Sequence, residues 1–288
     1  MKWKTSRFLL DLTTPKVMGI VNVTPDSFSD GCRHADVKSV LQHCEKLLRE
    51  GADILDIGAE STRPGASAVT LDEELARLLP VLREAIRLGV PISVDSYKPD
   101  VMQVALDLGA DILNDVWALR WRDAAADSLT ATQVVARHRA CGVCLMHMQG
   151  EPSTMQLSPM RGDAVAQVKR FLQEAASELQ RAGVDKNRIV IDPGIGFGKT
   201  AAQNFDLLAR QAELLGSDAP LLVGWSRKSS LTARAGITAG SAVGALADGR
   251  VVASVTAAVL SVERGASIVR VHDVLETVQA LKVLSAIR

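Results

Sequence analysis

The chain has 288 residues and is 47% hydrophobic, so it can bury a large core, either as one α/β barrel or as two ordinary domains. Lysine plus arginine and aspartate plus glutamate number 33 each, and this balance gives no reason to expect nucleic acid or another polyanion as a partner. The apolar stretch near the N-terminus is too short for a secretory signal, and the longest apolar run, Val251 to Val262, is shorter than the roughly 20 residues of a membrane span; both favour a cytoplasmic protein with no membrane partner.

A repeated pattern organises the chain. GADILDIG begins at Gly51, GADILNDV begins at Gly109 and GASIVRVHD begins at Gly265. Each copy follows an amphipathic helical stretch, opens with a glycine suited to a helix C-terminal cap, and continues as apolar residues that end in a polar one. This pattern is typical of a helix that leads into a buried parallel strand.

The same unit recurs along the sequence and predicts strands at Val17 to Val23, Asp53 to Gly58, Pro91 to Asp95, Asp111 to Asn114, Gly142 to His147, Ile189 to Asp192, Leu221 to Trp225 and Ser267 to Val271. Helical patterns lie between them, at Asp36 to Glu50, Leu71 to Leu88, Pro99 to Leu108, Thr130 to Ala140, Gly162 to Ala182, Asn204 to Leu215, an indistinct stretch after Lys228 that merges into Val251 to Arg264, and Val274 to Ile287. Strands rich in Ile, Val and Leu that alternate with helices predict a parallel sheet buried on both faces. We therefore expect one (β/α)8 TIM barrel domain over residues 1–288. An open doubly wound sheet is the alternative, disfavoured because no G-x-G-x-x-G follows the first strand.

Polar residues follow these strands where the active site of a barrel is built, at the carboxyl ends. Any one of them is explained as well by a capping side chain at a strand end. Asp95, Asn114 and Asp192, however, end three different strands and can project together into the barrel mouth. Buried acceptors need partners, and a ligand rich in N–H donors would supply them.

Two loops suit the same kind of ligand. DPGIGFGKT, from Asp192, allows close backbone approach to a flat molecule and offers Phe197 as an aromatic edge. RVHDV places Arg270 and His272 on one side of a strand end. Asn22 offers an oxygen ligand for a hard cation, and together with Arg270 and His272 it could hold an oxyanion such as a phosphate with Mg²⁺. A phosphosugar enzyme would fit this much of the pattern.

These segments carry a family resemblance. MGIVNVTPDSFSDG from Met18, GAESTRPGA from Gly58, DPGIGFGKT from Asp192, SRKS from Ser226 and RVHDV from Arg270 closely resemble dihydropteroate synthase, in order over nearly the whole chain. The resemblance implies a TIM barrel that condenses (7,8-dihydropterin-6-yl)methyl diphosphate with 4-aminobenzoate, releasing pyrophosphate and 7,8-dihydropteroate in folate biosynthesis. It also implies a sulfonamide target and a homodimer formed through helices late in the barrel, for which the helix around Val251 to Val262 is a candidate.

Carried over by position, the resemblance implies a role for each matching residue. It assigns the pterin to Asp95, Asn114, Asp192 and Lys228, the diphosphate to Asn22, Arg270 and His272, and Mg²⁺ to Asn22. It assigns the surroundings of 4-aminobenzoate to Phe28, Thr62, Arg63, Pro64, Phe197 and Ser229, and catalysis to Asp30, Arg63, Lys228, Arg270 and His272. Phe28 and Asp30 belong to a first loop, and Thr62 to Pro64 to a second, which would close over the reacting centre.

The residue types also suggest a mechanism. An arylamine is neutral at pH 7 and needs no general base before it attacks, and no triad-like nucleophile stands out in the sequence. We therefore expect a dissociative substitution, in which cations stabilise the departing pyrophosphate and the dihydropterin delocalises positive charge. Two other functions stay open. A pterin-binding methyltransferase barrel has no need of the TRPG, SRKS and RVHD segments. A non-catalytic pterin-binding paralogue would have lost the residues of the first loop or those of the diphosphate site.

Overall fold

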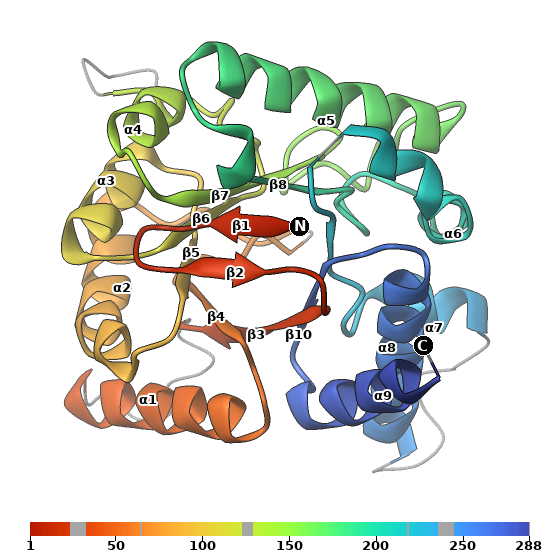
Figure 1. Cartoon of the computed structure of the whole chain (residues 1–288), viewed down its shortest axis with the longest axis horizontal. Helices are drawn as coiled ribbons and strands as arrows, with labels where there is room; N and C mark the ends of the chain where they lie inside the picture. Colours follow the sequence, from red (N-terminus) through yellow and green to blue (C-terminus); the bar gives the residue numbers. More distant parts are fainter. Residues whose placement is uncertain (24–32, 64, 123–128, 218, 236–244, 288) are drawn as a thin grey trace.

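The computed structural model describes residues 1–288 except 24–32, 64, 123–128, 218, 236–244 and 288. Eight parallel strands pair in the order β8-β7-β6-β5-β4-β3-β10-β9 (Figure 1). A bridge between Ile191 and Leu221 joins the two ends of this row, so the sheet closes into the expected (β/α)8 barrel. The strands are β3 (Lys16–Asn22), β4 (Ile54–Gly58), β5 (Ile92–Asp95), β6 (Ile112–Asp115), β7 (Gly142–Met146), β8 (Ile189–Asp192), β9 (Leu222–Val223) and β10 (Ile268–Val271).

Helices surround the strands and cover their outer faces (Figure 1). They are α1 (Arg33–Arg49), α2 (Leu71–Ala85), α3 (Pro99–Leu108), α4 (Ala131–Arg137), α5 (Ala164–Arg181), α6 (Ala201–Ala209), α7 (Ser229–Ala235), α8 (Ala245–Glu263) and α9 (Val274–Ala286), with short 3-10 turns at Ile86–Leu88, Lys186–Arg188 and Gln211–Ser217. Capping boxes start several of them: Thr70, Thr130 and Thr200 each accept from the backbone three residues on, where Glu or Gln returns the bond. None of the described helices is long and apolar enough to cross a bilayer.

The predicted alternation of strands and helices is confirmed, with shifts at the ends. The predicted helix at Leu71 to Leu88 is α2 followed by a 3-10 turn, and the one at Asn204 to Leu215 is α6 and another such turn. The indistinct stretch after Lys228 contains α7 and α8, and the seventh strand of the barrel is shorter than predicted.

Side chains along each strand alternate between the barrel interior and the helices. At the amino-terminal end the inward layer is an apolar cluster with members from different strands: Met18, Ile54, Ile112, Cys144, Val190, Leu222 and Ile268. Two residues further along, the corresponding positions are Ile20, Asp56, Asn114, Met146, Asp192, Gly224 and Arg270. The interior therefore changes from apolar to charged toward the carboxyl ends of the strands.

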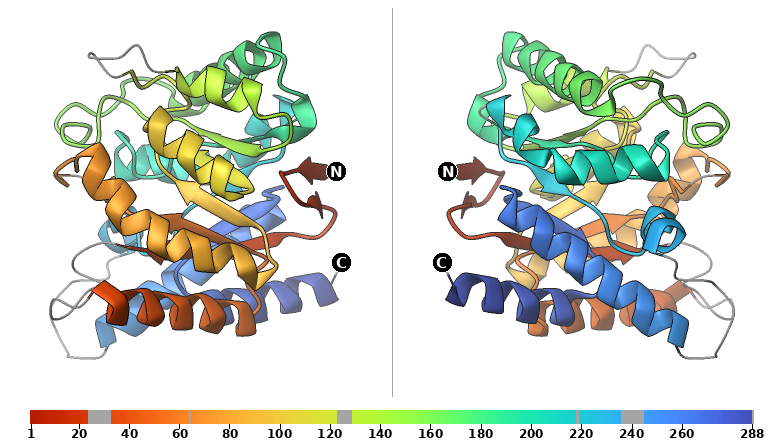
Figure 2. Two further views of the ribbon diagram at one scale, coloured as in Figure 1. Left: turned by 90° about the vertical axis from the view of Figure 1, so that its left-hand side faces the viewer. Right: turned by 90° about the vertical axis from the view of Figure 1, so that its right-hand side faces the viewer.

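A hairpin of β1 (Lys2–Lys4) and β2 (Leu9–Asp11), which the sequence did not predict, covers the amino-terminal end of the barrel (Figure 2). Trp3 is fully buried among the apolar inward layer, and its Nε1 donates to the Arg188 carbonyl at 2.9 Å. Gly142 makes room for it, since a Cβ there would lie 3.0 Å from Trp3 Nε1. The hairpin thus closes the end of the barrel opposite the charged layer.

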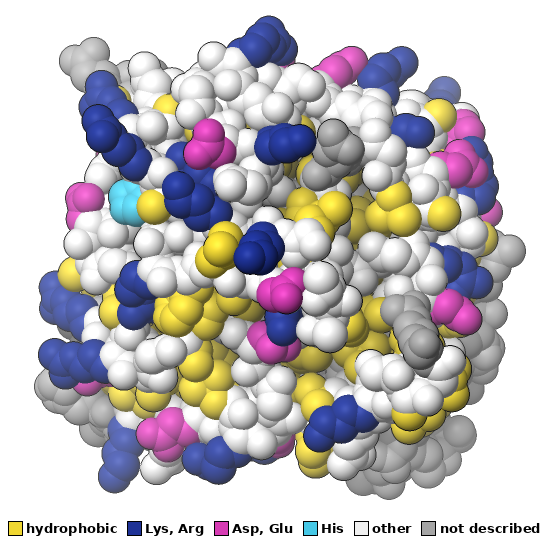
Figure 3. Space-filling view, in the orientation of Figure 1, with side chains coloured by type: hydrophobic (Ala, Val, Ile, Leu, Met, Phe, Trp, Pro, Cys, Tyr) yellow, Lys and Arg dark blue, Asp and Glu magenta, His cyan; other side chains and the backbone are white. Residues whose placement is uncertain are grey.

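On the face in Figure 3, basic and acidic side chains are interspersed, in keeping with the zero formal net charge of the chain.

Candidate active site

The carboxyl ends of the strands surround a cavity of about 420 Å³. Its lining includes Ile20, Asn22, Glu60, Ser61, Thr62, Arg63, Asp95, Asn114, Val116, Met146, Met155, Asp192, Phe197, Ser226, Arg227, Lys228, Ser229, Arg250, Arg270 and His272. A second cavity of about 480 Å³ extends between α1 and α9, and Asn22 and His272 line both. All the predicted site residues that the structure describes therefore meet in one place. Phe28, Asp30 and Pro64 lie outside the described residues.

Strand register brings the polar residues together. Asn22, Gly58, Asp95 and Asn114 are successive partners across β3, β4, β5 and β6. A Cβ at Gly58 would lie 3.2 Å from the Asp95 Cβ, so glycine leaves room between the neighbouring polar side chains. Asn22, Asp95 and Asn114 of this row thus line the cavity together.

Arg270 is held between two carboxylates inside the barrel. Its Nε donates to Asp56 Oδ2 at 2.6 Å and its Nη2 donates to Asp95 Oδ2 at 2.7 Å. Burial lowers the pKa of Arg270, but Asp56 and Asp95 outweigh this effect and raise it above the usual value. Burial also raises the pKa of Asp95 to about 7, against the opposing charge of Arg270. Arg270 is therefore a fixed cation that both carboxylates hold in place.

The amide of Asn114 has a defined orientation. Its Nδ2 donates to Asp56 Oδ2 at 3.1 Å, so its carbonyl oxygen is left for the cavity that the residue lines. Asp56 Oδ1 is buried and has no hydrogen-bond partner among the described residues. Asp56 thus fixes both Arg270 and Asn114, although it was not predicted as a site residue.

Asp192 presents a second acceptor. Its Oδ1 accepts from the Gly194 backbone N–H at 2.7 Å, which orients the carboxylate. Gly194 has φ of 65°, and a Cβ there would overlap the His147 carbonyl, so the turn after β8 requires glycine. Burial raises the pKa of Asp192, and the Gly194 bond and Lys228 oppose that shift.

Lys228 lines the same cavity. Its Nζ is 4.3 Å from the centre of the Phe197 ring, in the range of a cation–π contact. Burial, with the nearby charge of Arg270, lowers the pKa of Lys228 to about 8. The next residue, Ser229, starts α7 and also lines the cavity. A cation and an aromatic face therefore stand together in the cavity that Asp95, Asn114 and Asp192 also line.

A buried lysine organises the glycine-rich loop after β8. Lys199 Nζ contacts His147 Nδ1 at 2.9 Å, the Gly194 carbonyl at 2.9 Å and the Phe197 carbonyl at 3.1 Å. Burial lowers the pKa of Lys199 to about 7, and burial with the charge of Lys199 lowers that of His147 to about 2. Neutral His147 accepts from the lysine, and the loop carrying Phe197 is held in place from beneath.

His272 is also neutral. Burial and the charges of Arg270 and Arg227 lower its pKa to about 3. Its Nδ1 lies 3.0 Å from Ser226 Oγ, and Ser226 Oγ accepts from the His272 backbone N–H at 3.1 Å. Near it, Asn22 has an exposed side chain at the meeting point of the two cavities. These two residues can present uncharged polar atoms to an anion or to its counter-ion.

The loop between β4 and α2 brings Thr62 and Arg63 to the rim of the cavity. The Arg63 side chain is exposed, and its carbonyl accepts from the Ala66 N–H at 3.0 Å in a turn. The Gly65 N–H donates to the Pro152 carbonyl at 3.4 Å. The loop between β4 and α2 is thus joined to the loop after β7 by a backbone hydrogen bond.

Comparison with known proteins identifies this arrangement. A family model described as pterin binding enzyme matches residues 18–272. The dihydropteroate synthase of Neisseria meningitidis serogroup B is 48% identical, with 99% of this chain and 97% of the relative covered. The chain belongs to the dihydropteroate synthase family of pterin-binding enzymes. Solved structures agree: Xanthomonas albilineans dihydropteroate synthase with 4-aminobenzoic acid has a TM-score of 0.85 at 46% identity, covering 97% of this chain and 95% of that one. The Burkholderia cenocepacia dihydropteroate synthase complexed with 7,8-dihydropteroate also has a TM-score of 0.85, at 44% identity, covering 100% and 96%.

Several polar residues around this dihydropteroate synthase site were not predicted from the sequence. Asp56 lies inside the apolar strand segment ILDIG, where the inward direction of position 56 is its only signal. Lys199 stands at the end of the GFGK segment and contacts backbone carbonyls, which the sequence does not mark. Glu60 lies in the motif that was read for its neighbours Thr62 and Arg63.

Proposed function

We propose that the chain condenses (7,8-dihydropterin-6-yl)methyl diphosphate with 4-aminobenzoate to give 7,8-dihydropteroate and pyrophosphate. This activity makes the protein a transferase of folate biosynthesis. The observation that carries the proposal is that one cavity holds both sets of residues: the acceptors Asp95, Asn114 and Asp192 on its floor and Thr62, Arg63 and Ser229 on its rim. Its volume of about 420 Å³ suits ligands of this size.

The floor of the cavity is the proposed pterin site. A pterin ring presents an N–H beside an exocyclic NH₂, a pair of donors that matches a carboxylate as a guanidinium does. Asp192 is oriented for that edge, and the Asn114 carbonyl oxygen and Asp95 provide the remaining acceptors. Lys228 donates to the ring oxygen and nitrogen on the opposite edge.

The rim is the proposed 4-aminobenzoate site. Thr62 and Arg63 approach it from the loop after β4, Phe197 from the loop after β8 and Ser229 from the start of α7. Arg63 can pair with the aminobenzoate carboxylate or with the diphosphate, and the ring can rest on Phe197. Phe28, Asp30 and Pro64 are proposed to complete this side of the site.

Asn22, Arg270 and His272 are the proposed diphosphate residues. The side-chain oxygen of Asn22 fits Mg²⁺, which favours oxygen ligands and usually keeps several waters and substrate phosphates around it. Its exposed position beside His272 leaves room for such a substrate-bound ion. Bound there, Mg²⁺ would neutralise charge on the leaving group. Arg270 has two of its nitrogens on carboxylates, and among the described residues its Nη1 has no hydrogen-bond partner, so Nη1 can donate to a phosphate.

The proposed reaction is dissociative. The bond between the pterin methylene and the diphosphate oxygen breaks first, and its electron pair leaves with pyrophosphate. Arg270 and Lys228 stabilise the negative charge that develops, while the acceptors on the floor stabilise the positive charge delocalised over the pterin. The neutral amine then attacks the methylene carbon and afterwards loses a proton to solvent. Closure of the first loop, which contains Phe28 and Asp30, and of the second loop, which contains Thr62 and Arg63, would keep water away from the cation.

Two other functions are less well supported. A pterin-binding methyltransferase barrel would need the floor of the cavity but not Thr62, Arg63, Ser229 or His272, all of which line it here. A non-catalytic paralogue would be expected to have lost the cationic residues. Lys228 and Arg270 are present and face the same cavity.

The deciding experiment is pyrophosphate release by the purified protein with the dihydropterin diphosphate and Mg²⁺, with and without 4-aminobenzoate. Release coupled to dihydropteroate establishes the activity, and additional release without aminobenzoate supports departure before attack. Pterin binding without release in either case would leave a pterin-binding barrel and refute the enzyme proposal. Repeating the assay after EDTA treatment and with added Mg²⁺ tests the metal.

The dissociative step has its own test. A substrate deuterated at the reacting methylene should show a normal secondary isotope effect under conditions in which bond cleavage limits the rate. A value near unity under those conditions would contradict the proposed step.

We propose a homodimer formed through α8 and α9. Among the described residues, four large apolar side chains are exposed on these helices or next to them: Val252 on α8 (65% exposed), Leu275 (43%) and Val283 (69%) on α9, and Ile287 (79%) just after α9. Leu275 and Val283 are eight residues apart, so both lie along one side of α9. Light scattering should give twice the chain mass for the wild type, and Val283→Glu should shift it toward a monomer.

We also propose a cytoplasmic location. Cys44, Cys141 and Cys144 are buried free thiols, a state that suits a reducing compartment. Fractionation of the native host with an antibody would test it.

A further inference from the structure

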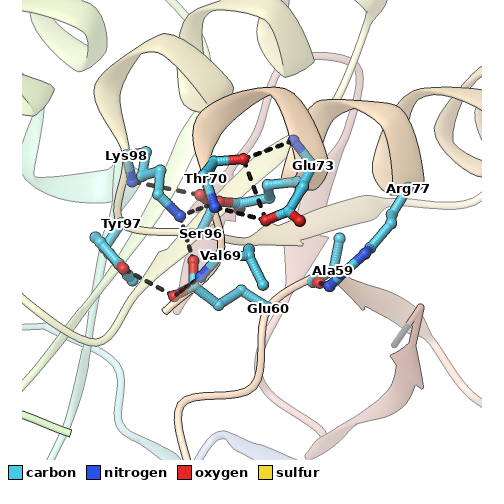
Figure 4. Close-up of polar contacts among 10 residues, drawn as sticks. Ala59, Glu60, Val69, Thr70, Glu73, Arg77, Ser96, Tyr97 and Lys98 are labelled. Atoms are coloured by element: carbon cyan, nitrogen blue, oxygen red, sulfur yellow. Dashed lines mark hydrogen bonds and ion pairs between the residues drawn. The ribbon is translucent and has the colours of Figure 1, made fainter. Parts of the chain in front are cut away.

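A buried cluster of charged side chains lies under the loop between β4 and α2. It consists of Glu60, two residues after the end of β4, Glu74 on α2, and Tyr97 and Lys98 before α3. Figure 4 shows Glu60, Tyr97 and Lys98. The side chains of Glu60, Glu74 and Lys98 are only 6%, 1% and 9% exposed. None of the four has an assigned role in the reaction, although Glu60 reaches the edge of the cavity.

Both oxygens of Glu60 are engaged. Oε1 accepts from the Tyr97 hydroxyl at 2.8 Å and from the Val69 N–H at 3.4 Å, and Oε2 pairs with Lys98 Nζ. Val69 is the last loop residue before Thr70, which caps α2. One carboxylate therefore joins the two ends of the loop that contains Thr62 and Arg63 (Figure 4).

The ion pairs of Lys98 restrain Glu60. Lys98 Nζ also pairs with Glu74 Oε2 at 2.6 Å, so a single cation serves two buried carboxylates. Burial raises the pKa of Glu74, against the charge of Lys98. Removing one partner from a buried ion pair is strongly destabilising because the other charge is left uncompensated. Glu60 thus has little freedom to move away from Lys98.

Tyr97 extends the connection to the next loop. Its ring centre lies 5.3 Å from that of Trp121 and 6.4 Å from that of Trp117, and its apolar cluster includes Met155, which lines the cavity. Glu60 is therefore held by the loop after β5, through Tyr97 and Lys98, as well as by Val69 of its own loop.

We propose that Glu60 is a positioning residue for the 4-aminobenzoate side of the site. Held by Tyr97 and Lys98, it fixes the base of the loop and so the placement of Thr62 and Arg63 at the rim. Its own oxygens are occupied, so it acts through the loop and not by contacting substrate. The inference rests on the proposed function, because it assigns Thr62 and Arg63 to aminobenzoate.

The test compares Glu60→Gln and Tyr97→Phe with Glu84→Gln, a matched control at an exposed pair on α2. Steady-state kinetics give KM for aminobenzoate and kcat, and calorimetry with unreactive 6-hydroxymethylpterin gives pterin affinity. We expect KM for aminobenzoate to rise about tenfold in Glu60→Gln and about threefold in Tyr97→Phe, as for the loss of a hydrogen bond to a charged group. Pterin affinity should stay within about twofold of the wild type, and the control should be unchanged.

Lys98→Met provides a charge test. Alone it leaves two carboxylates without a cation, whereas Glu60→Gln with Lys98→Met removes a charge of each sign. We expect the fold increase in KM for aminobenzoate in the double variant to be well below the product of the fold increases in the two single variants, because the residues act as one unit.

Two results would overturn the proposal. If pterin affinity in Glu60→Gln falls by as much as KM for aminobenzoate rises, Glu60 serves the whole site. If KM for aminobenzoate is unchanged in both Glu60→Gln and Tyr97→Phe, the loop does not depend on Glu60. Failure of the proposed function is seen separately, since the wild-type protein would then release no pyrophosphate.

Discussion

Replacing Asp192 by Asn isolates the contribution of one carboxylate to pterin binding. The change keeps the volume of the side chain and replaces one acceptor oxygen by an NH₂ donor. In the structure Asp192 Oδ1 already accepts from the Gly194 N–H at 2.7 Å. An asparagine must therefore direct its NH₂ either at that backbone donor or at the N–H edge of the pterin, and either orientation sets two donors against each other.

The magnitude follows from this geometry. The variant loses a charge-assisted hydrogen bond, worth about 1.5–3 kcal/mol, and leaves a donor unsatisfied at a cost of about 1–3 kcal/mol. A sum of about 4 kcal/mol corresponds to roughly 1,000-fold weaker pterin binding. Stability should respond differently. Burial raises the pKa of Asp192, so its ionised form is costly in the fold at neutral pH, and Asn should leave the melting temperature unchanged or higher.

Calorimetry with 6-hydroxymethylpterin measures the affinity, and thermal unfolding measures the stability. Asp206→Asn, at an exposed position on α6, is the matched control. A loss of affinity smaller than about tenfold would refute the assignment of Asp192 to the two-donor edge. A large fall in melting temperature would instead mean that its bond to Gly194 mainly supports the fold.

Three further predictions concern other parts of the barrel. Asp56→Asn should keep both hydrogen bonds through its remaining oxygen but lose the charge opposite Arg270, so pterin affinity measured by calorimetry should fall by about tenfold. Asp56→Ala also frees Asn114 and should lower pterin affinity further. Because the pKa of Lys228 is lowered to about 8, kcat/KM for the pterin substrate should fall as pH rises above 8, and Lys228→Arg should abolish this alkaline limb even if it binds more weakly; an identical limb in the variant would assign it to another group. Trp3→Ala should destabilise the fold by about 3–5 kcal/mol in urea unfolding with KM values unchanged, since Trp3 is fully buried at the end of the barrel away from the cavity, and a shift in KM would show that the two ends are coupled.

The barrel was predictable because its strands are buried on both faces. Near-continuous apolar segments that alternate with amphipathic helices leave few architectures open, and the loops after the strands carry the polar residues. The N-terminal hairpin gave no such signal. Its strands have three residues each, and Trp3 contacts Arg188, 185 residues away in the sequence, so only tertiary packing reveals it.

The site was predictable where side chains point to substrate and not where they point to each other. Asp95 and Asp192 end their strands and Asn114 is the last residue but one of its strand, so all three were found by position and family resemblance. Asp56 and Lys199 hold other parts of the site in place. Asp56 binds Arg270 of another strand, and Lys199 donates to the backbone carbonyl of Gly194. Which residues become partners depends on the register and closure of the barrel, neither of which the sequence specifies locally.

The ion pairs of Arg270 bear on how the site is used. A guanidinium between Asp56 and Asp95 has its charge offset before any substrate arrives, so it attracts a free phosphate weakly. A pterin that donates to Asp95 would compete for that carboxylate and release part of the charge of Arg270. Diphosphate binding and pterin binding should therefore favour each other, and inorganic pyrophosphate should bind more tightly when 6-hydroxymethylpterin is present. In Asp95→Asn, where Arg270 is already partly released, this coupling should shrink; equal coupling in the variant and the wild type would contradict the role of the shared carboxylate.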